Sequence, residues 1–239
     1  METTTMANGN GVTMMRDVLF NIPNIIGYIR VTLFLAGIWQ IQSNDNYIFG
    51  SSMYVLNCIL DELDGRCARR YKQCTQFGAL LDIILDVVCM TIWKVGVLTQ
   101  RYPQYAMAIY FHAAITMMAE WMHHHGSQVG VAIYNPQKGN TSSALLNFYY
   151  SGFSGTFGSF VVWVYWIFWL MLYIVSYTSG PTVPTFGIGL WELILLLSTP
   201  ATIFRFGITL VKIRNAVDIM VSLDLPIQTH LQYIDNKAE

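Results

Sequence analysis

The chain has 239 residues, of which 54% are hydrophobic and 11% charged, and its formal net charge is −1. A soluble globular domain has roughly a quarter of its residues charged, so this composition excludes an ordinary soluble protein and indicates a polytopic membrane protein. The net charge says little about partners, whereas the positions of the charges along the chain are informative.

The first 20 residues are polar, and we expect them to form a disordered tail before the first membrane span. A helix that crosses a bilayer needs about 20 mostly apolar residues. Six stretches approach this requirement: 25–41, 46–62, 76–98, 103–122, 156–177 and 188–211. The predicted fold class is therefore all-α, a six-transmembrane-helix bundle over residues 21–215. The remaining residues, 216–239, are expected to form a C-terminal tail.

The basic residues predict the orientation of these spans. Four of them lie in the short loop between the second and third spans: Arg66, Arg69, Arg70 and Lys72. Loops that are rich in lysine and arginine face the cytosol. With six spans, this loop and both termini lie on the same side of the membrane, so both tails are expected to be cytosolic.

Four aspartates flank that loop, although an ionised carboxylate near a membrane is costly unless it is paired or bound to a metal. One helix face before the loop carries four residues of interest: Asp61, Asp64, Gly65 and Ala68. A second face after the loop carries three, at intervals of four positions: Gly78, Asp82 and Asp86. Two antiparallel helices joined near residues 71–75 can turn these faces toward each other. Four carboxylates would then surround one cavity.

Such a cavity suits hard divalent cations, Mg²⁺ or Mn²⁺, because both ions prefer oxygen ligands. Two of these ions a few ångströms apart can clamp a diphosphate and stabilise a departing phosphate. Small residues beside the carboxylates let a substrate approach the backbone closely, and Arg69 can bind a phosphate with two nitrogens. Two other interpretations remain open at this point. One is an ion-pair network with Arg66, Arg69 and Arg70, and the other is a proton or cation pathway through a transporter.

Arg30 lies inside the first predicted span, and an arginine within the membrane is a functional candidate by default. The alternative for Arg30 is an ion pair, or a side chain that reaches the cytosolic interface. Asn24 and Gln76 are further candidates for polar contacts in the same cavity.

The pattern Asp61-x-x-Asp64-Gly65-x-x-Ala68-Arg69, eight residues, Gly78-x-x-x-Asp82-x-x-x-Asp86 resembles the complete signature of the CDP-alcohol phosphotransferases. Within that family the chain is most similar to the eukaryotic phosphatidylinositol synthases. The similar segments are 23–30 (PNIIGYIR), 76–82 (QFGALLD), 121–125 (WMHHH) and the pair Tyr149-Tyr150. The resemblance covers most of residues 20–224, and the signature is its most specific part.

The resemblance implies that CDP-diacylglycerol donates its phosphatidyl group to myo-inositol and that CMP leaves. It implies that Asp61, Asp64, Asp82 and Asp86 hold two Mg²⁺ or Mn²⁺ ions, with Asp86 also placed to act as general base. The residues implied to bind the nucleotide or the CDP-lipid are Asp64, Gly65, Ala68, Arg69 and Gly78. The residues implied to contact the acceptor or a phosphate are Arg30, Asn24 and Gln76.

The chain departs from the synthases in three places. Val87 follows the last aspartate where the synthases usually have an arginine, and residues 116–120 lack an aspartate that they tend to carry. An arginine expected soon after Tyr150 is also missing. These departures keep open another acceptor within the family, namely glycerol phosphate, serine or a lipid alcohol. A non-catalytic membrane protein or a transporter is the alternative from a different class.

The resemblance also implies partners and a location. Membrane lipid is an expected partner, a homodimer is implied, and no nucleic-acid partner is expected. The chain is expected to be a multi-pass protein of the endoplasmic reticulum, or of the Golgi, with the active site facing the cytosol.

Overall fold

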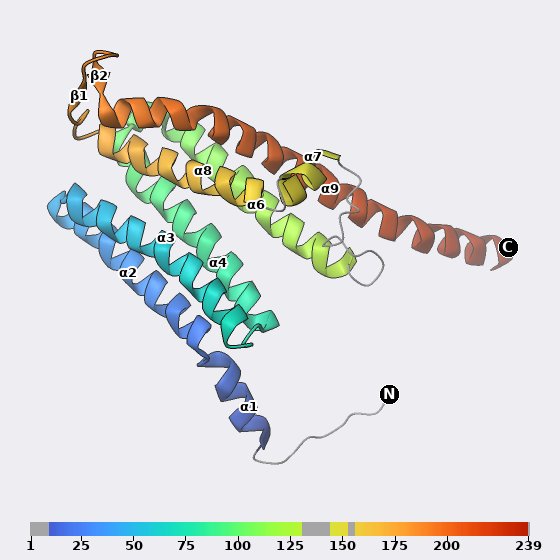
Figure 1. Ribbon diagram of the computed structural model, residues 1–239. Coiled ribbons are helices and arrows are strands. Elements are labelled where there is room, and N and C mark those ends of the chain that lie inside the picture. The colour runs from blue at the N-terminus through green and yellow to red at the C-terminus, as the bar shows by residue number, and fades with distance from the viewer. Residues whose placement is uncertain (1–9, 131–143, 153–155, 239) are drawn as a thin grey trace. The chain divides into compact units, whose positions relative to one another are not determined.

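The computed structural model describes residues 10–130, 144–152 and 156–238, most of them in helices (Figure 1). The chain divides into two compact units, Met1–Pro103 and Gln104–Glu239.

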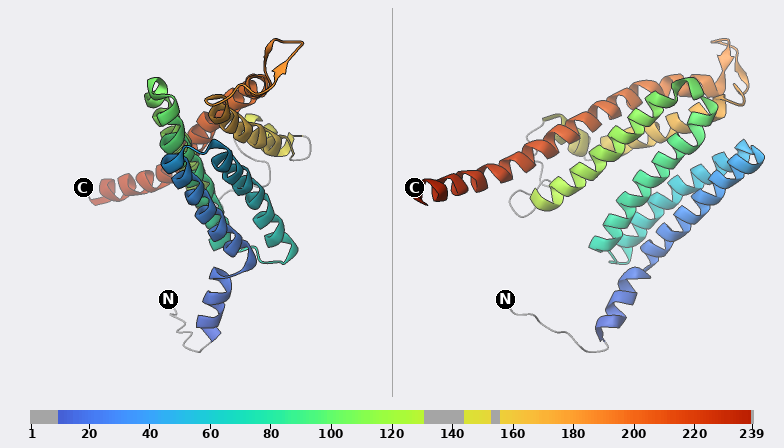
Figure 2. Two further views of the ribbon diagram at one scale, coloured as in Figure 1. Left: turned by 90° about the vertical axis from the view of Figure 1, so that its left-hand side faces the viewer. Right: turned by 180° about the vertical axis from the view of Figure 1, so that it is seen from behind.

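The first unit is built on three long helices that lie side by side (Figures 1 and 2). They are α2 (Ile22–Asn44), α3 (Tyr47–Arg70) and α4 (Gln76–Ile92). The shorter elements are α1 (Asn10–Leu19), a π-helix η1 (Trp93–Leu98) and α5 (Thr99–Arg101). A 3₁₀ turn, η2 (Pro103–Tyr105), begins at the last residue of this unit. The connection between α3 and α4 covers residues 71–75, where the sequence predicts the loop.

Side-chain caps determine where the three long helices begin. The side-chain oxygen of Asn21 accepts a hydrogen bond from the Asn24 amide at 2.9 Å, and Thr75 accepts one from the Gly78 amide at 2.9 Å. Asn46 caps α3 in the same way. Each cap satisfies a backbone donor that the first turn leaves free. Because the side chains of a helix follow its start at a fixed period, the cap at Thr75 sets the direction of every residue on α4.

Close packing of α2 against α3 and α4 depends on two glycines. A Cβ atom added to Gly37 on α2 would lie 2.6 Å from the Cβ of Met53 on α3. A Cβ added to Gly27 would lie 3.2 Å from Leu85 on α4. The missing side chains let the backbones approach, as is common between helices in membranes. This approach brings Arg30 of α2 within reach of α3 and α4.

The second unit contains α6 (Ala106–Gly130), α7 (Ala144–Ser151), α8 (Thr156–Val175) and the long α9 (Leu190–Ala238). Both α6 and α8 pack along α9 (Figure 2). A small antiparallel hairpin, β1 (Thr182–Val183) with β2 (Ile188–Gly189), joins α8 to α9 and pairs Thr182 with Gly189. A buried cluster of Leu146, Tyr149, Val161 and Ile208 ties α7 and α8 to α9.

The predicted helical character of the chain is confirmed, with the short hairpin as an addition that the sequence did not indicate. Among the residues that the structure describes, three helices are long and apolar enough to cross a membrane: Ile22–Asn44, Thr156–Val175 and Leu190–Ser222. They coincide with the first, fifth and sixth predicted spans. The second, third and fourth fall on α3, α4 and α6, whose membrane crossing stays a prediction.

The two expected tails contain helix. Apolar residues recur at positions 12, 15 and 19, a helical spacing, and α1 covers this part of the expected N-terminal tail. At the other end α9 continues without a break to Ala238, so the expected boundary at residue 215 falls within it. The cytosolic placement of both ends stays a prediction.

Candidate functional site

Arg30 stands at the centre of the four aspartates in the first unit. Its Nη1 atom lies 2.8 Å from Asp64 Oδ2 and 3.1 Å from Asp82 Oδ1. Its Nη2 atom lies 2.5 Å from Asp61 Oδ1 and 2.8 Å from Asp86 Oδ1. The arginine comes from α2, the first pair of aspartates from α3 and the second pair from α4. Each terminal nitrogen therefore joins one carboxylate of α3 to one carboxylate of α4.

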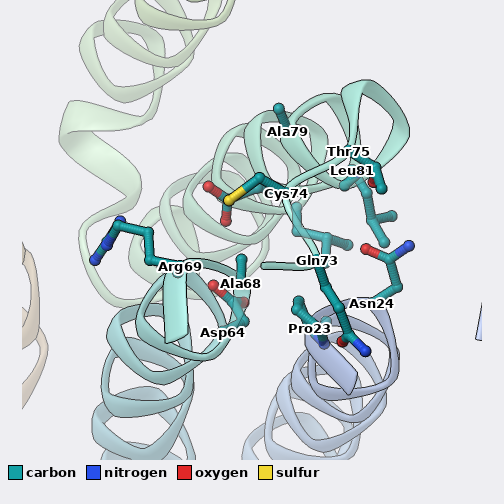
Figure 3. Close-up of a pocket in the computed structure, with 15 residues that line it drawn as sticks. Pro23, Asn24, Asp64, Ala68, Arg69, Gln73, Cys74, Thr75, Ala79 and Leu81 are labelled. Carbon is teal, nitrogen blue, oxygen red and sulfur yellow. Dashed lines mark hydrogen bonds between the residues drawn. The ribbon is translucent and has the colours of Figure 1, made fainter. Parts of the chain in front are cut away.

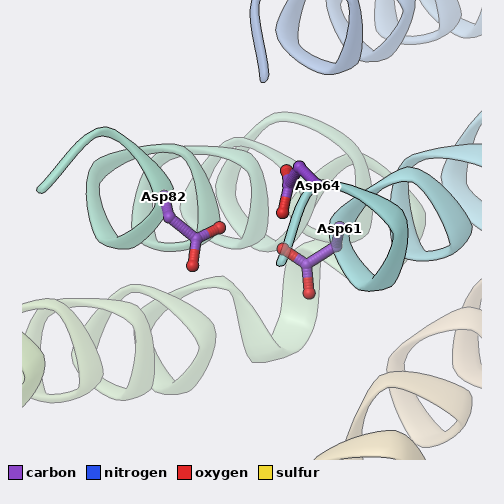
Figure 4. Close-up of side chains that lie close together, drawn as sticks. All are labelled: Asp61, Asp64 and Asp82. Carbon is purple, nitrogen blue, oxygen red and sulfur yellow. The ribbon is translucent and has the colours of Figure 1, made fainter. Parts of the chain in front are cut away.

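Three of the carboxylates are close enough to share one ion. Asp61, Asp64 and Asp82 each offer an oxygen, and these oxygens all lie within 4.8 Å of one another (Figure 4). The i, i+3 spacing on α3 and the i, i+4 spacing on α4 set each pair on one helix face, and the loop at 71–75 returns α4 alongside α3. Together these features bring all four carboxylates to one place.

The cluster carries more negative than positive charge. When all four carboxylates are ionised, Arg30 leaves an excess of three negative charges. Neighbouring like charges in a poorly solvated place are unfavourable without further cations. Oxygens of all four aspartates already converge on the guanidinium at 2.5–3.1 Å, so the donor set is arranged around a cation. Carboxylate oxygens in this arrangement fit Mg²⁺ or Mn²⁺.

The cluster is accessible from one side. The side chains of Asp82 and Asp86 are 47% and 39% exposed, whereas those of Asp61 and Asp64 are 18% and 10% exposed. An ion can therefore approach from the α4 side without opening the helix bundle.

A pocket of about 150 Å³ adjoins the cluster (Figure 3). It lies between α2, α3, α4 and the loop that joins the last two, and Figure 3 shows side chains from all four segments around it. Its lining includes every residue expected to bind the nucleotide or the CDP-lipid: Asp64, Gly65, Ala68, Arg69 and Gly78. The pocket thus connects the small residues of the signature to the carboxylate Asp64 and to Asp82.

Glycine at position 78 leaves room for one wall of this pocket. A Cβ atom added there would lie 3.0 Å from Asn24 Oδ1 and 3.0 Å from Thr75 Oγ1. Asn24 is buried and lines the pocket, and its Nδ2 donates to the Val18 carbonyl at 2.6 Å. A larger residue at position 78 would displace either this amide or the cap of α4.

The loop residues of the pocket were missed by sequence reasoning. Gln73 Oε1 accepts a hydrogen bond from the Ile22 amide at 3.2 Å, and Asn21 Nδ2 donates to the Gln73 carbonyl at 3.5 Å. These bonds tie the loop to the start of α2. Thr75 had a usable signal, since a threonine just before a helix is a preferred N-cap. Gln73 had none, because its partners are about fifty residues away in the sequence.

Arg30 and Gln76 lie elsewhere than in the pocket lining. Gln76 is the first residue of α4 and is exposed. Both terminal nitrogens of Arg30 are engaged by the aspartates.

The ion-pair interpretation names Arg66, Arg69 and Arg70 as partners of the aspartates. The ion pairs found for the four aspartates are made instead by Arg30. Arg66 pairs instead with Glu62 on its own helix, at 2.9 Å.

A second charged cluster lies in the second unit. Glu120 of α6 accepts from Arg205 at 2.6 Å and from Lys212 at 2.9 and 2.7 Å, and both cations belong to α9. Lys212 also lies 6.0 Å from the ring centre of Tyr150, whose hydroxyl is 3.0 Å from His123 Nε2. No partner for Glu120 could be predicted from the sequence, because 85 and 92 residues separate it from the two cations.

Comparisons with known proteins agree with the sequence signature. The family model described as CDP-alcohol phosphatidyltransferase matches residues 20–175, more than half of the chain. A protein of Drosophila melanogaster named CDP-diacylglycerol–inositol 3-phosphatidyltransferase is 29% identical over 189 residues, 79% of this chain and 80% of that protein. Proteins of the same name from Rattus norvegicus and Saccharomyces cerevisiae are 26% and 27% identical over 87% of this chain, covering 94% and 89% of their own lengths. No solved structure matches the chain.

Proposed function

The chain belongs to the CDP-alcohol phosphatidyltransferase family, and we propose that it transfers the phosphatidyl group from CDP-diacylglycerol to myo-inositol and releases CMP. The relatives with this named activity match along most of both chains. The observation that carries the proposal is the position of the aspartate cluster. Four carboxylates converge on one cation beside a pocket lined by all five residues expected to hold the CDP-lipid.

We assign the metal site to Asp61, Asp64, Asp82 and Asp86, which would hold two Mg²⁺ or Mn²⁺ ions. When bound, the two ions supply positive charge that neutralises the diphosphate and stabilises the phosphate of the departing CMP. The protein fixes the carboxylates on two rigid helices, so little rearrangement of the backbone is needed for binding.

Asp86 is the proposed general base. The acceptor hydroxyl oxygen attacks the β-phosphorus of the CDP-lipid, a new P–O bond forms, and the P–O bond to CMP breaks. The hydroxyl proton passes to the Asp86 carboxylate, which is 39% exposed and therefore accessible. A hydroxyl is a poor nucleophile at neutral pH, and a positioned base accelerates such a step by roughly 10²–10⁴-fold.

The pocket residues bind and orient the donor. Gly65, Ala68 and Gly78 leave space for the nucleotide to approach the backbone, and Arg69 is placed to pair with a phosphate. Asn24 offers a buried amide to the acceptor or to a phosphate. Gln76, exposed at the start of α4, is proposed to meet substrate outside the pocket lining.

The cellular location and the partners of the protein follow from the same proposed function. The protein is an integral membrane protein with apolar helices long enough to span a bilayer. We place it in the endoplasmic reticulum, with the Golgi as the alternative, with the aspartates facing the cytosol and with two copies forming a homodimer. Membrane lipid, CDP-diacylglycerol and myo-inositol are its proposed partners. Glycerol phosphate, serine or a lipid alcohol is the alternative acceptor.

The deciding experiment supplies CDP-diacylglycerol and labelled myo-inositol, glycerol 3-phosphate or serine to the full chain in detergent–lipid micelles. Each reaction contains Mg²⁺, Mn²⁺ or a chelator. Label transferred from inositol alone, and lost with the chelator, supports the proposal. Label transferred from another acceptor would show that the protein is a member of the family with a different acceptor specificity. A protein that binds CDP-diacylglycerol yet labels none of the three would contradict the proposal.

A further inference from the structure

The aspartate cluster already contains a cation that belongs to the chain. The side chain of Arg30 is 1% exposed, and its two terminal nitrogens make ion pairs with four carboxylates at 2.5–3.1 Å. Its Nε atom is buried without a hydrogen-bond partner among the described residues. Both terminal nitrogens of the guanidinium are therefore directed at oxygens of the proposed metal site.

Arg30 and divalent ions cannot use these oxygens at the same time. Mg²⁺ binds carboxylate oxygens at about 2.1 Å, and Arg30 already contacts one oxygen from each of the four aspartates. Each aspartate keeps a second oxygen, so the charge balance decides the outcome. Two divalent ions bring four positive charges to four carboxylates, and no negative charge then remains to hold a guanidinium that the ions repel. Binding of both ions is therefore expected to make the guanidinium withdraw.

We propose that Arg30 is an exchangeable counter-ion. It holds the aspartates together in the metal-free protein and is displaced when divalent ions bind. This inference rests on the proposed metal site, and it assigns Arg30 a role that precedes any contact with substrate. After displacement the guanidinium becomes available for a phosphate, so metal must bind before Arg30 can contact the CDP-lipid.

The fork of an arginine suits this role better than the single ammonium of a lysine. Nη1 bridges Asp64 and Asp82, and Nη2 bridges Asp61 and Asp86, so each nitrogen joins α3 to α4. A lysine offers a compact point charge that cannot occupy two such positions. Without the fork, the aspartate pairs of α3 and α4 repel each other in the metal-free protein.

The test measures Mn²⁺ binding by calorimetry, in the full chain, in micelles and without substrate. Removing a competing cation should tighten binding, so Arg30→Gln is expected to bind Mn²⁺ roughly tenfold more tightly than wild type, or better. Its metal-free melting temperature should fall and should recover when Mn²⁺ is added. Arg66→Gln is the matched control, because it removes a nearby positive charge that pairs only with Glu62 among the described contacts. It should bind Mn²⁺ as wild type does.

Arg30→Lys covers the case in which Arg30→Gln cannot be purified without metal. It retains the charge but loses the fork, so it should bind Mn²⁺ more tightly than wild type, by a smaller factor, and melt earlier in the metal-free state. Unchanged or weaker Mn²⁺ binding in the Arg30 variants would overturn the inference about Arg30 without contradicting the proposed metal site. Absence of Mn²⁺ binding in wild type and variants alike would instead overturn the proposed metal site.

Discussion

Lys212 and Glu120 form a two-point ion pair between α9 and α6, with Lys212 Nζ at 2.9 and 2.7 Å from the two carboxylate oxygens. The Lys212 side chain is only 6% exposed, and Arg205 contacts the same carboxylate at 2.6 Å. One carboxylate is therefore the shared counter-charge of two poorly solvated cations. Removing one partner of such a cluster costs far more than removing an exposed ion pair, because the remaining charges stay buried.

We expect Glu120→Gln to destabilise the second unit by about 3 kcal/mol, since two cations lose their counter-charge while the shape of the side chain is kept. Thermal unfolding in micelles measures the loss. Glu62→Gln is the matched control, because Glu62 pairs with the exposed Arg66 and should cost less than about 1 kcal/mol. Equal losses of stability in the two variants would show that the Glu120 cluster contributes no more to stability than an exposed ion pair.

Neutral variants of the aspartates should separate their roles. Asp61→Asn and Asp82→Asn are expected to abolish turnover through loss of metal, whereas Asp86→Asn should lower turnover by roughly 10²-fold or more with a smaller effect on nucleotide binding. The measurements are the rate of CMP release and the affinity for CDP-diacylglycerol. Asp218→Asn, an exposed aspartate near Arg214 in the second unit, is the control. A similar loss of nucleotide affinity in all three site variants would contradict the division of roles.

Gly78→Ala should weaken binding of the CDP-lipid, because the new Cβ would lie 3.0 Å from Asn24 Oδ1 and from the capping oxygen of Thr75. We expect an affinity loss of roughly tenfold, equivalent to about 1.4 kcal/mol. Gly207→Ala is the control, since its Cβ would meet nothing within 4 Å and alanine favours a helix. Unchanged CDP-lipid affinity in Gly78→Ala would mean that the pocket wall yields without affecting the ligand.

Removal of metal should stop catalysis without unfolding the protein. A chelator is expected to abolish CMP release while the helical circular dichroism persists, because Arg30 still neutralises part of the aspartate cluster. Activity and ellipticity are followed in the same sample, and Mn²⁺ added afterwards should restore turnover. Collapse of the helical signal on chelation would show that Arg30 does not support the metal-free state.

The residues of the candidate site and their positions along the chain could be predicted from local sequence patterns. The helical period placed Asp61 with Asp64 and Asp82 with Asp86 on single faces, and the basic loop between them predicted the turn at 71–75. The helical period and the basic loop are local properties, because each depends on residues that are neighbours in the sequence. The same holds for the family resemblance, which depends on the order of residues from Asp61 to Asp86.

Contacts between side chains that are distant in the sequence could not be predicted in this way and became visible in the folded chain. Arg30 joins the aspartates because glycines at positions 27 and 37 let α2 approach α3 and α4 closely. Glu120 finds Lys212 because α6 packs along α9. Such contacts depend on how each helix is rotated and how closely it packs, and steric fit over the whole contact surface sets both. Spacing within a single helix is fixed by the backbone, whereas pairing between helices emerges only when the helices are packed.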